Sequence, residues 1–356
     1  MNRFHGGDIY RNKIIIDFSI NTNPLGIPDE VKNALHGAVE TAAAYPDIMA
    51  EELKRAVGGM LKLPEEYLLF GNGASELFLA VVHGIKPGKT VIPIPSFYGY
   101  EYAAGVREGE IVYYEMARAL EPESEKEKAF CLREDFLETL TEDVDLLFLA
   151  NPNNPTGVML DRDYLENLLV YCRRREIVVV LDECFIEFCG EGNSMVDALK
   201  RFENLVLVRA FTKIFSIPGV RLGYLCSSNR PLLKKIERQL PEWNVSAFAQ
   251  AAGCACAMQG DFTAQTAAYI KGERRFLEEG LRGLGLKVFC GEANFILVYS
   301  EVPLYEELLK KGILIRDCEN FRGLSKGFYR IAVRGREENE VLLKAIGEIR
   351  WKKERI

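Results

Sequence analysis

The stretch that decides the fold is "IVVVLDECF", residues 177–185. Its first five residues are apolar without a break, and four of them are β-branched. Such a run is typical of a strand that is buried on both faces of a sheet. Asp182 follows at the carboxyl end of this strand, where an isolated carboxylate is costly to bury. The stretch therefore predicts a central strand whose terminal aspartate either caps a helix or meets a cationic partner.

The chain around this stretch repeats a pattern of short apolar runs separated by helical segments. In "DYLENLLVYCRRR" (163–175), apolar residues recur every three or four positions, which is the spacing of an amphipathic helix. Strands that alternate with helices predict a mostly parallel sheet covered by helices on both faces. The other runs that we interpret as strands of this sheet lie at 67–70, 90–94, 145–150, 205–210 and 221–226.

After about residue 245 the pattern changes. A long helical stretch covers 245–284, and short apolar runs such as "FILVYS" and "GFYRIAVR" follow it. A last helix is expected from Glu337 onward. The sequence therefore predicts a large α/β domain followed by a smaller α+β domain.

Composition excludes several classes of function. The 356 residues carry a net charge of −7 without a basic block, which argues against a nucleic-acid partner. The N-terminus lacks the apolar core of a secretion signal, and no apolar stretch reaches the roughly 20 residues that span a bilayer. Nine cysteines without a Cys-x-x-Cys pair indicate a reduced, cytoplasmic protein. With three histidines, none spaced as a ligand pair, neither a metal site nor a Ser-His triad is expected.

Four polar motifs occur where strands are expected to end. They are "FGNGASE" (70–76), "PSFYGY" (95–100), "LANPNNPTG" (149–157) and "RAFTKIFSIPGVRLGY" (209–224). In an open parallel sheet, ligands bind beyond the carboxyl ends of the strands. Each motif alone also fits a purely structural role, such as an ordinary turn or a lysine at a surface strand end. Together with Asp182 they indicate a ligand site at one edge of the sheet.

The residues of these motifs match the needs of pyridoxal phosphate. That cofactor needs an amine for its aldehyde, a carboxylate for its ring nitrogen, donors for its phosphate and ring oxygen, and a stacking ring. Lys213 offers the amine and Asp182 the carboxylate. Asn154 can donate to the ring oxygen, and Phe97 can stack on the ring. The candidates to bind the phosphate are Gly73, Ala74, Ser75 and Arg221.

The order GNG…PSF…NPNNPTG…LDE…TK…PGVRLGY resembles the fold-type I pyridoxal-phosphate enzymes of the aminotransferase superfamily, over essentially the whole chain. Within it, "NPLG" (23–26) and "AYPD" (44–47) are similar to both histidinol-phosphate aminotransferases and the threonine-phosphate decarboxylases of cobalamin synthesis. "HGGDIY" (5–10) and the segment 313–334 resemble the decarboxylases more closely. Phe185 also favours them, because the aminotransferases usually have a tyrosine there.

The resemblance implies a domain organisation and a partner. It implies a fold-type I structure with a large domain built on a mostly parallel seven-stranded sheet, and a smaller α+β domain. The expected boundaries are 1–30 for an N-terminal arm that packs with the small domain, 31–245 for the large cofactor-binding domain and 246–356 for the small domain. It also implies a homodimer, because Tyr45 would reach the cofactor phosphate of the neighbouring subunit.

The resemblance further implies individual roles. Lys213 would attach the cofactor and Asp182 would pair with its ring nitrogen, and both are the expected catalytic residues. Arg330 would hold the substrate carboxylate, although Arg334 lies on the same expected strand face and could replace it. The remaining residues expected around the cofactor are Gly73, Ala74, Ser75, Phe97, Asn154, Thr212 and Arg221, and those expected around the substrate phosphate are His5, Asn21 and Arg316. The chain departs from the family pattern at Ala210, where a hydroxyl commonly helps to bind the cofactor phosphate.

The expected reaction is the decarboxylation of an O-phosphorylated amino acid. Phosphothreonine would give aminopropanol phosphate, and phosphoserine would give ethanolamine phosphate. The first alternative is a histidinol-phosphate aminotransferase, because the orientation of the substrate alone decides whether carbon dioxide or a proton leaves its α-carbon. The second is a non-catalytic ligand sensor, which the chain disfavours because it has no residues to spare for a DNA-binding domain.

Overall fold

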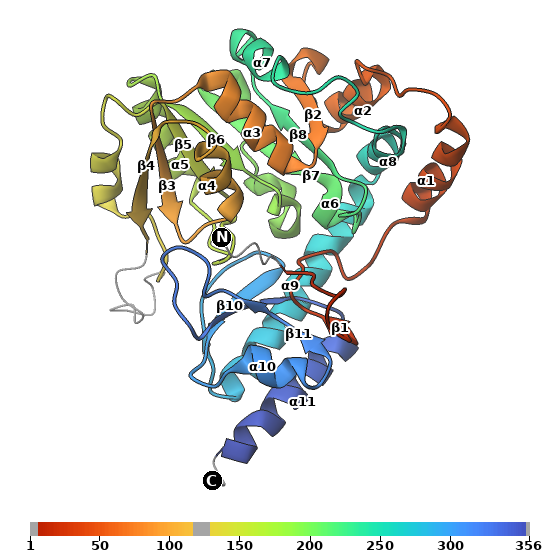
Figure 1. The fold of residues 1–356 in the computed structure, drawn as a ribbon, viewed down its shortest axis with the longest axis vertical. Helices are drawn as coiled ribbons and strands as arrows, with labels where there is room; N and C mark the ends of the chain where they lie inside the picture. Colours follow the sequence, from red (N-terminus) through yellow and green to blue (C-terminus); the bar gives the residue numbers. More distant parts are fainter. Residues whose placement is uncertain (1–5, 117–128, 354–356) are drawn as a thin grey trace.

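A seven-stranded sheet forms the centre of the larger part of the computed structural model, which describes residues 6–116 and 129–353 (Figure 1). The strand order is β2-β8-β7-β6-β5-β3-β4. The five strands from β7 to β4 run parallel, whereas β8 is antiparallel to both of its neighbours. The predicted fold class, a mostly parallel seven-stranded sheet, is confirmed. The strands span Leu68–Asn72 (β2), Lys89–Ile94 (β3), Glu110–Glu115 (β4), Leu146–Ala150 (β5), Val178–Asp182 (β6), Leu205–Ala210 (β7) and Leu222–Cys226 (β8).

Helices cover both faces of this sheet, as the apolar central strand requires. Along β6, Val180 packs into a cluster with residues of α3, α4 and α7, whereas Val179 and Leu181 pack into a second cluster with residues of α2, α5 and α8. Successive side chains of a strand point to opposite faces, so an unbroken apolar run is buried on both sides. The helices of this part span Asp29–Thr41 (α1), Glu51–Leu61 (α2), Ala74–Ile85 (α3), Tyr98–Ala104 (α4), Arg162–Arg173 (α5), Phe211–Ile214 (α6), Arg230–Glu237 (α7) and Ala247–Ala257 (α8).

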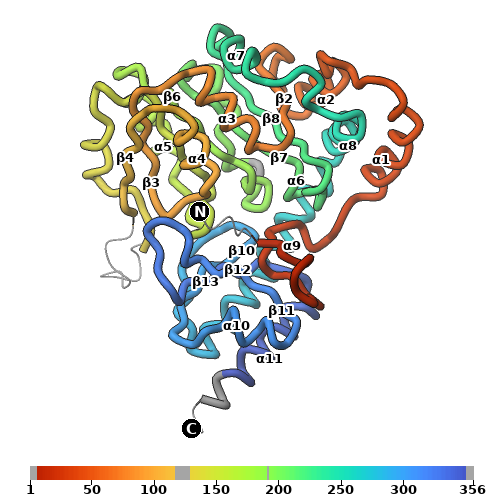
Figure 2. Tube along the Cα trace, viewed as in Figure 1, coloured from red at the N-terminus to blue at the C-terminus, as the bar shows by residue number. Residues whose placement is uncertain are grey.

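The C-terminal part is built on a four-stranded antiparallel sheet of order β12-β13-β10-β9. The N-terminal segment joins it, because β1 pairs in parallel with β11; Figure 2 shows this segment (red) beside the C-terminal strands (blue). The boundaries of the predicted domains stay predictions. The elements span Ile16–Asp17 (β1), Lys287–Val288 (β9), Phe295–Tyr299 (β10), Ile313–Leu314 (β11), Arg316–Asp317 (β12), Phe328–Ala332 (β13), Gly260–Gly283 (α9), Leu304–Leu309 (α10) and Arg336–Lys353 (α11).

Two segments differ from the sequence prediction. The expected helical stretch 245–284 is two helices, α8 and α9, with a break at 258–259. Gly260 follows this break, and glycine is the residue that, after proline, most disfavours a helix interior. Arg221 was expected in a strand, but it has a φ of +63° and β8 begins one residue later. None of the helices within the described ranges is long and apolar enough to cross a bilayer.

Candidate active site

A cavity of about 300 Å³ lies beyond the carboxyl ends of β5, β6 and β7. It is lined by residues from both parts of the chain, and most of the predicted site residues line it. His5 lies outside the described residues, and neither Tyr45 nor Gly73 lines the cavity. The predicted residues that do line it are Asn21, Ala74, Ser75, Phe97, Asn154, Asp182, Thr212, Lys213, Arg221, Arg316 and Arg330.

Asp182 ends β6 and is held by neutral donors from Tyr100 and Cys184, including the Cys184 thiol. The Tyr100 hydroxyl donates to Oδ2 at 2.5 Å, and the backbone N–H of Cys184 donates to Oδ1 at 2.9 Å. Burial is the main cause that raises the pKa of the Asp182 carboxyl above its usual range. Within the described ranges no lysine or arginine forms an ion pair with it, and it does not cap a helix. The carboxylate therefore faces the cavity without a cationic partner from residues 6–116 and 129–353.

Lys213 lies on α6, the short helix that follows β7, and its side chain faces the same cavity. Burial, followed by the positive charges of Arg330 and Arg221, lowers the pKa of its amine to about 8. A lysine with a lowered pKa is more often neutral, which is the state that attacks a carbonyl. The amine is thus suited to covalent attachment of an aldehyde.

An anion site lies where β2 turns into α3. Gly73 has a φ of +75°, and a Cβ added to it would lie 2.3 Å from Nη2 of Arg221. Any larger residue would therefore displace the guanidinium from this turn. The first N–H groups of α3 have no intrahelical partner and carry the positive end of the helix dipole. Thr212 and Ala210 also line the cavity, and Ala210 contributes no hydroxyl.

Arg330 lies on β13 and fixes the amide of Asn154. Its Nη1 donates to Oδ1 of Asn154 at 2.5 Å, and its Nη2 donates to the carbonyl of Ser19 at 2.8 Å. Because Oδ1 of Asn154 accepts from the arginine, its Nδ2 is left to donate to a ligand. Burial lowers the pKa of the Arg330 guanidinium to about 10, so this charge is poorly solvated. Arg334 instead pairs with Glu338 at 3.0 Å and does not line the cavity.

Arg316 lies directly opposite Arg330 in the register of β12 and β13. Its Nη2 donates to Oδ1 of Asn320 at 2.7 Å, and its guanidinium lies 5.1 Å from the ring centre of Phe321. Burial lowers the pKa of this guanidinium as well. Arg316 also lines two neighbouring hollows of about 450 and 420 Å³, beside the N-terminal segment and beside α4. Two poorly solvated guanidinium groups therefore meet at one edge of the cavity.

Three of the aromatic residues that the sequence analysis singled out differ in their surroundings. Phe97 lies at the start of α4 and packs edge-on against Tyr100, with ring centres 5.7 Å apart. Phe185 lines the cavity and packs edge-on against Phe295, so it offers no donor to a ligand. Tyr45 is 81% exposed, and its ring lies 4.8 Å from that of Trp243.

Sequence reasoning missed Tyr100, although it donates directly to Asp182. The segment "YGYEY" contains three tyrosines within five residues, and nothing in composition separates them. Helical spacing does separate them, because Tyr100 shares the buried face of α4 with Ala103 and Ala104. Tyr102, in contrast, is 46% exposed.

The family model for class I and II aminotransferases matches residues 13–346. The chain belongs to this family. It is 34% identical to a threonine-phosphate decarboxylase of Salmonella typhimurium, over 98% of this chain and 97% of the relative. It is 35% identical to a histidinol-phosphate aminotransferase of Desulfitobacterium hafniense, over 96% of this chain and 94% of the relative. Members of this family depend on pyridoxal phosphate, and this chain is a pyridoxal-phosphate enzyme, either a lyase or an aminotransferase.

Solved structures agree with the family. The histidinol-phosphate aminotransferase of Clostridium acetobutylicum superposes with a TM-score of 0.87 at 31% identity, over 94% of this chain and 99% of the neighbour. The L-threonine-O-3-phosphate decarboxylase of Porphyromonas gingivalis superposes with a TM-score of 0.80 at 25% identity, over 93% and 98%. Both activities are therefore represented among proteins of the same architecture.

The cavity fits pyridoxal phosphate on the geometry of this chain alone. The tight contact between Gly73 and Arg221 forms a cradle that suits a phosphate. Asp182 is buried with neutral donors, so it has a charge to offer to a protonated ring nitrogen. Lys213 faces the same space with an amine of lowered pKa. The donor set thus matches the phosphate, the ring nitrogen and the aldehyde of one molecule.

Proposed function

We propose that the chain catalyses the decarboxylation of an O-phosphorylated amino acid, with L-threonine O-3-phosphate as the first candidate. The observation that carries this proposal is the opposed pair Arg316 and Arg330 at one edge of the cavity. Two poorly solvated guanidinium groups fit a small substrate that bears two anions, a carboxylate and a phosphate. The 34% identity with a threonine-phosphate decarboxylase along nearly the full chain supports the same substrate class.

The residues that would hold the cofactor follow from the cavity. Lys213 would attach the aldehyde, Asp182 would face the ring nitrogen, and Nδ2 of Asn154 would donate to the ring oxygen. Phe97 would stack on the ring. The phosphate would lie against Gly73, Ala74, Ser75, Thr212 and Arg221. When bound, pyridoxal phosphate supplies a ring that accepts the electrons of the bond broken at the substrate's α-carbon.

The chain's own residues would select that bond. Arg330 holds the carboxylate, and Arg316 holds the phosphate together with Asn21 and the N-terminal segment that includes His5. Two anions fixed at two points leave the substrate little freedom to rotate about its α-carbon, so the positions of Arg316 and Arg330 decide whether carbon dioxide or a proton is lost. In this proposal the two arginines hold the substrate in the orientation from which carbon dioxide leaves. The Lys213 amine, with its pKa near 8, is placed to return a proton to that carbon.

The proposed assembly is a cytoplasmic homodimer with Tyr45 at the interface. Tyr45 is exposed and rests on Trp243, and the neighbouring Ile48 and Met49 are each 50% exposed. A cluster of exposed apolar side chains is typical of an interaction surface. In such a dimer Tyr45 would reach the cofactor phosphate of the other subunit.

The test is a carbon-dioxide assay on the purified holoenzyme. We expect release of carbon dioxide from O-phosphothreonine without any added keto acid, and slower release or none from threonine, because threonine lacks the phosphate. Phosphoserine lacks one methyl group, so its rate relative to phosphothreonine reports how closely the pocket fits that methyl group. Equal rates for phosphothreonine and threonine would contradict the proposed role of the arginine pair.

The second candidate is histidinol-phosphate aminotransfer. The TM-score of 0.87 with such an enzyme is the observation that favours it. Phe185 argues against it modestly, because a phenyl ring removes one donor to the cofactor's ring oxygen. Activity that appears only with histidinol phosphate and 2-oxoglutarate would establish this alternative and exclude the decarboxylase.

A further inference from the structure

Tyr100 is the residue of α4 that reaches the carboxylate at the end of β6. It is 1% exposed, and its hydroxyl donates to Oδ2 of Asp182 at 2.5 Å. Three rings fix its orientation. Phe148 stacks on it with an interplanar angle of 10°, and Phe78 and Phe97 pack edge-on at 86° and 82°. The ring therefore holds the hydroxyl at one place in the cavity wall.

The Tyr100 hydroxyl stays protonated and so remains a donor. Burial, followed by the negative charge of Asp182, raises the pKa of this phenol well above 10. The groups that face Asp182 from the elements around it are Tyr100 on α4, Cys184 after β6 and Lys213 on α6 across the cavity. Hydrogen bonds to a carboxylate favour its charged form, whereas burial disfavours it. The thiol and the backbone N–H of Cys184 also bond to Asp182, and Tyr100 is thus one of three donors that offset its burial.

We propose that Tyr100 is a positioning residue that keeps Asp182 ionised and aimed at the cofactor's ring nitrogen. The inference rests on the proposed placement of that nitrogen beside Asp182. Tyr100 acts through the aspartate, because its hydroxyl donates its hydrogen bond to Oδ2 of Asp182. Without this donor the carboxylate is a stronger base, and the proton that it shares with the ring nitrogen moves toward Asp182. The ring then accepts electrons less well, and the reaction slows.

The test compares Tyr100→Phe with Tyr102→Phe in holoenzyme that is loaded with ¹⁵N-labelled pyridoxal phosphate. Each change removes one hydroxyl from α4, but Tyr102 is half-exposed and lies away from Asp182. In Tyr100→Phe, we expect the ring-nitrogen signal to move toward that of an unprotonated pyridine. We also expect kcat to fall about tenfold with KM within twofold, the size of one hydrogen bond to a charged group. Tyr102→Phe should leave both unchanged.

An unchanged nitrogen signal in Tyr100→Phe would overturn the inference. If the melting temperature falls while the signal stays unchanged, the hydroxyl has a packing role only. The signal reports on the cofactor and not on the reaction. If the parent enzyme transaminates and does not decarboxylate, a shifted nitrogen signal in Tyr100→Phe still supports the inference while the proposed function fails.

Discussion

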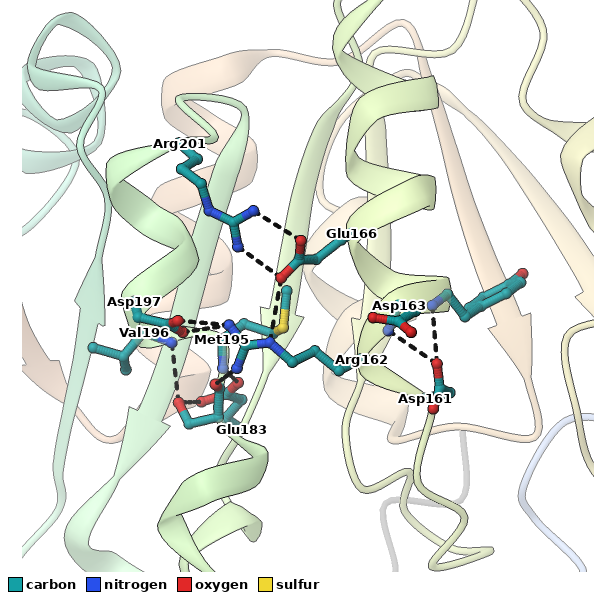
Figure 3. A network of polar contacts seen from close by, with 11 residues as sticks. Asp161, Arg162, Asp163, Glu166, Glu183, Met195, Val196, Asp197 and Arg201 are labelled. Atoms are coloured by element: carbon teal, nitrogen blue, oxygen red, sulfur yellow. Dashed lines mark hydrogen bonds and ion pairs between the residues drawn. The ribbon is translucent and has the colours of Figure 1, made fainter.

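Asp182 and Glu183 are neighbouring buried carboxylates with opposite surroundings. Asp182 faces the cavity and has neutral donors only among the described residues. Glu183 points to the other side, where Oε2 accepts from Nε of Arg209 at 3.0 Å and from the Ser194 hydroxyl at 2.7 Å. The N–H of Met195 completes this set at Oε1, 2.8 Å away (Figure 3). In the part of the chain that the structure describes, Glu183 therefore has a cationic partner and Asp182 has none.

The difference separates a structural charge from a functional one. Both residues are less than 10% exposed, so burial does not distinguish them. A buried carboxylate that lacks an internal cation is costly unless a ligand supplies the charge. The Glu183–Arg209 pair joins the ends of β6 and β7, and it holds the strand end from which Asp182 projects. Substitutions at the two carboxylates should therefore have different effects on activity and on stability.

Asp182→Asn removes the functional charge. We expect kcat to fall about a thousandfold, because the cofactor's ring nitrogen loses the anion that keeps it protonated. The apoprotein should be as stable as the parent or more stable, because an amide avoids the burial cost of the carboxylate. Steady-state kinetics and urea unfolding of the apoprotein measure the two effects. Near-parental kcat would contradict the assignment of Asp182.

Glu183→Gln removes the structural charge and leaves Arg209 without its closest anion. We expect the free energy of unfolding to fall by about 3–5 kcal/mol, as when one partner of a buried ion pair is lost. The folded fraction should retain kcat within about threefold. If instead kcat fell as far as in Asp182→Asn, with stability unchanged, the two carboxylates would not differ in role.

Lys213→Met tests the buried amine in the apoprotein. The pKa is about 8 in the folded chain and 10.5 when exposed, so below pH 8 the lysine is protonated in both states and its burial destabilises the fold. Between pH 8 and 10.5 the unfolded chain binds more protons, and the parent gains stability as the pH rises. The variant should therefore be more stable by up to about 3 kcal/mol at pH 7, with the advantage lost toward pH 10.5. Urea unfolding across this range measures it; a pH-independent difference would contradict the lowered pKa.

Arg201→Ala removes a solvated charge for comparison. Arg201 pairs with Glu166 at 2.6 Å on the surface beside Arg162 and Asp197 (Figure 3). We expect a melting temperature within about 2 °C of the parent, because water screens exposed pairs. The main cause that lowers the pKa of Glu166 to about 2 is its hydrogen bond with Arg201. The contribution of this pair is therefore fully present above pH 4.5 and lost as the pH falls through 2. Thermal melts should show a larger parent–variant difference at pH 7 than at pH 3, and an equal difference at both would contradict the lowered pKa.

The sequence predicted the large sheet well because its central strands are unbroken apolar runs. The edge strand β4 was missed, because "EIVYYE" is partly exposed and ends in charged residues. The apolar run "GILIR" (312–316) predicts a strand where β11 lies, but its pairing with β1 could not be predicted, since it joins residues almost 300 positions apart. The local sequence pattern therefore predicts strands that are buried on both faces, whereas strands that are half-exposed or very short depend on pairing with distant residues.

The candidate site was predictable in part for a similar reason. Lys213, Asp182 and Asn154 follow strands that the sequence identifies, so their meeting at one edge follows from topology. The sequence could not tell which of Arg330 and Arg334 lines the cavity, because both lie on the same face of one expected strand. In the structure Arg330 bonds to Asn154 in the cavity wall, whereas Arg334 pairs with Glu338. Tyr100 was missed because its role depends on the approach of α4 to β6.

The most direct measurement of the central claim is borohydride reduction of the purified protein, followed by mass spectrometry of its peptides. Reduction makes a covalent bond between a lysine and pyridoxal phosphate permanent. We expect a single modified lysine, Lys213, in the peptide that follows Arg209, and no modification after substitution of that lysine. Modification of a different lysine, or none in protein that carries the cofactor, would contradict the account.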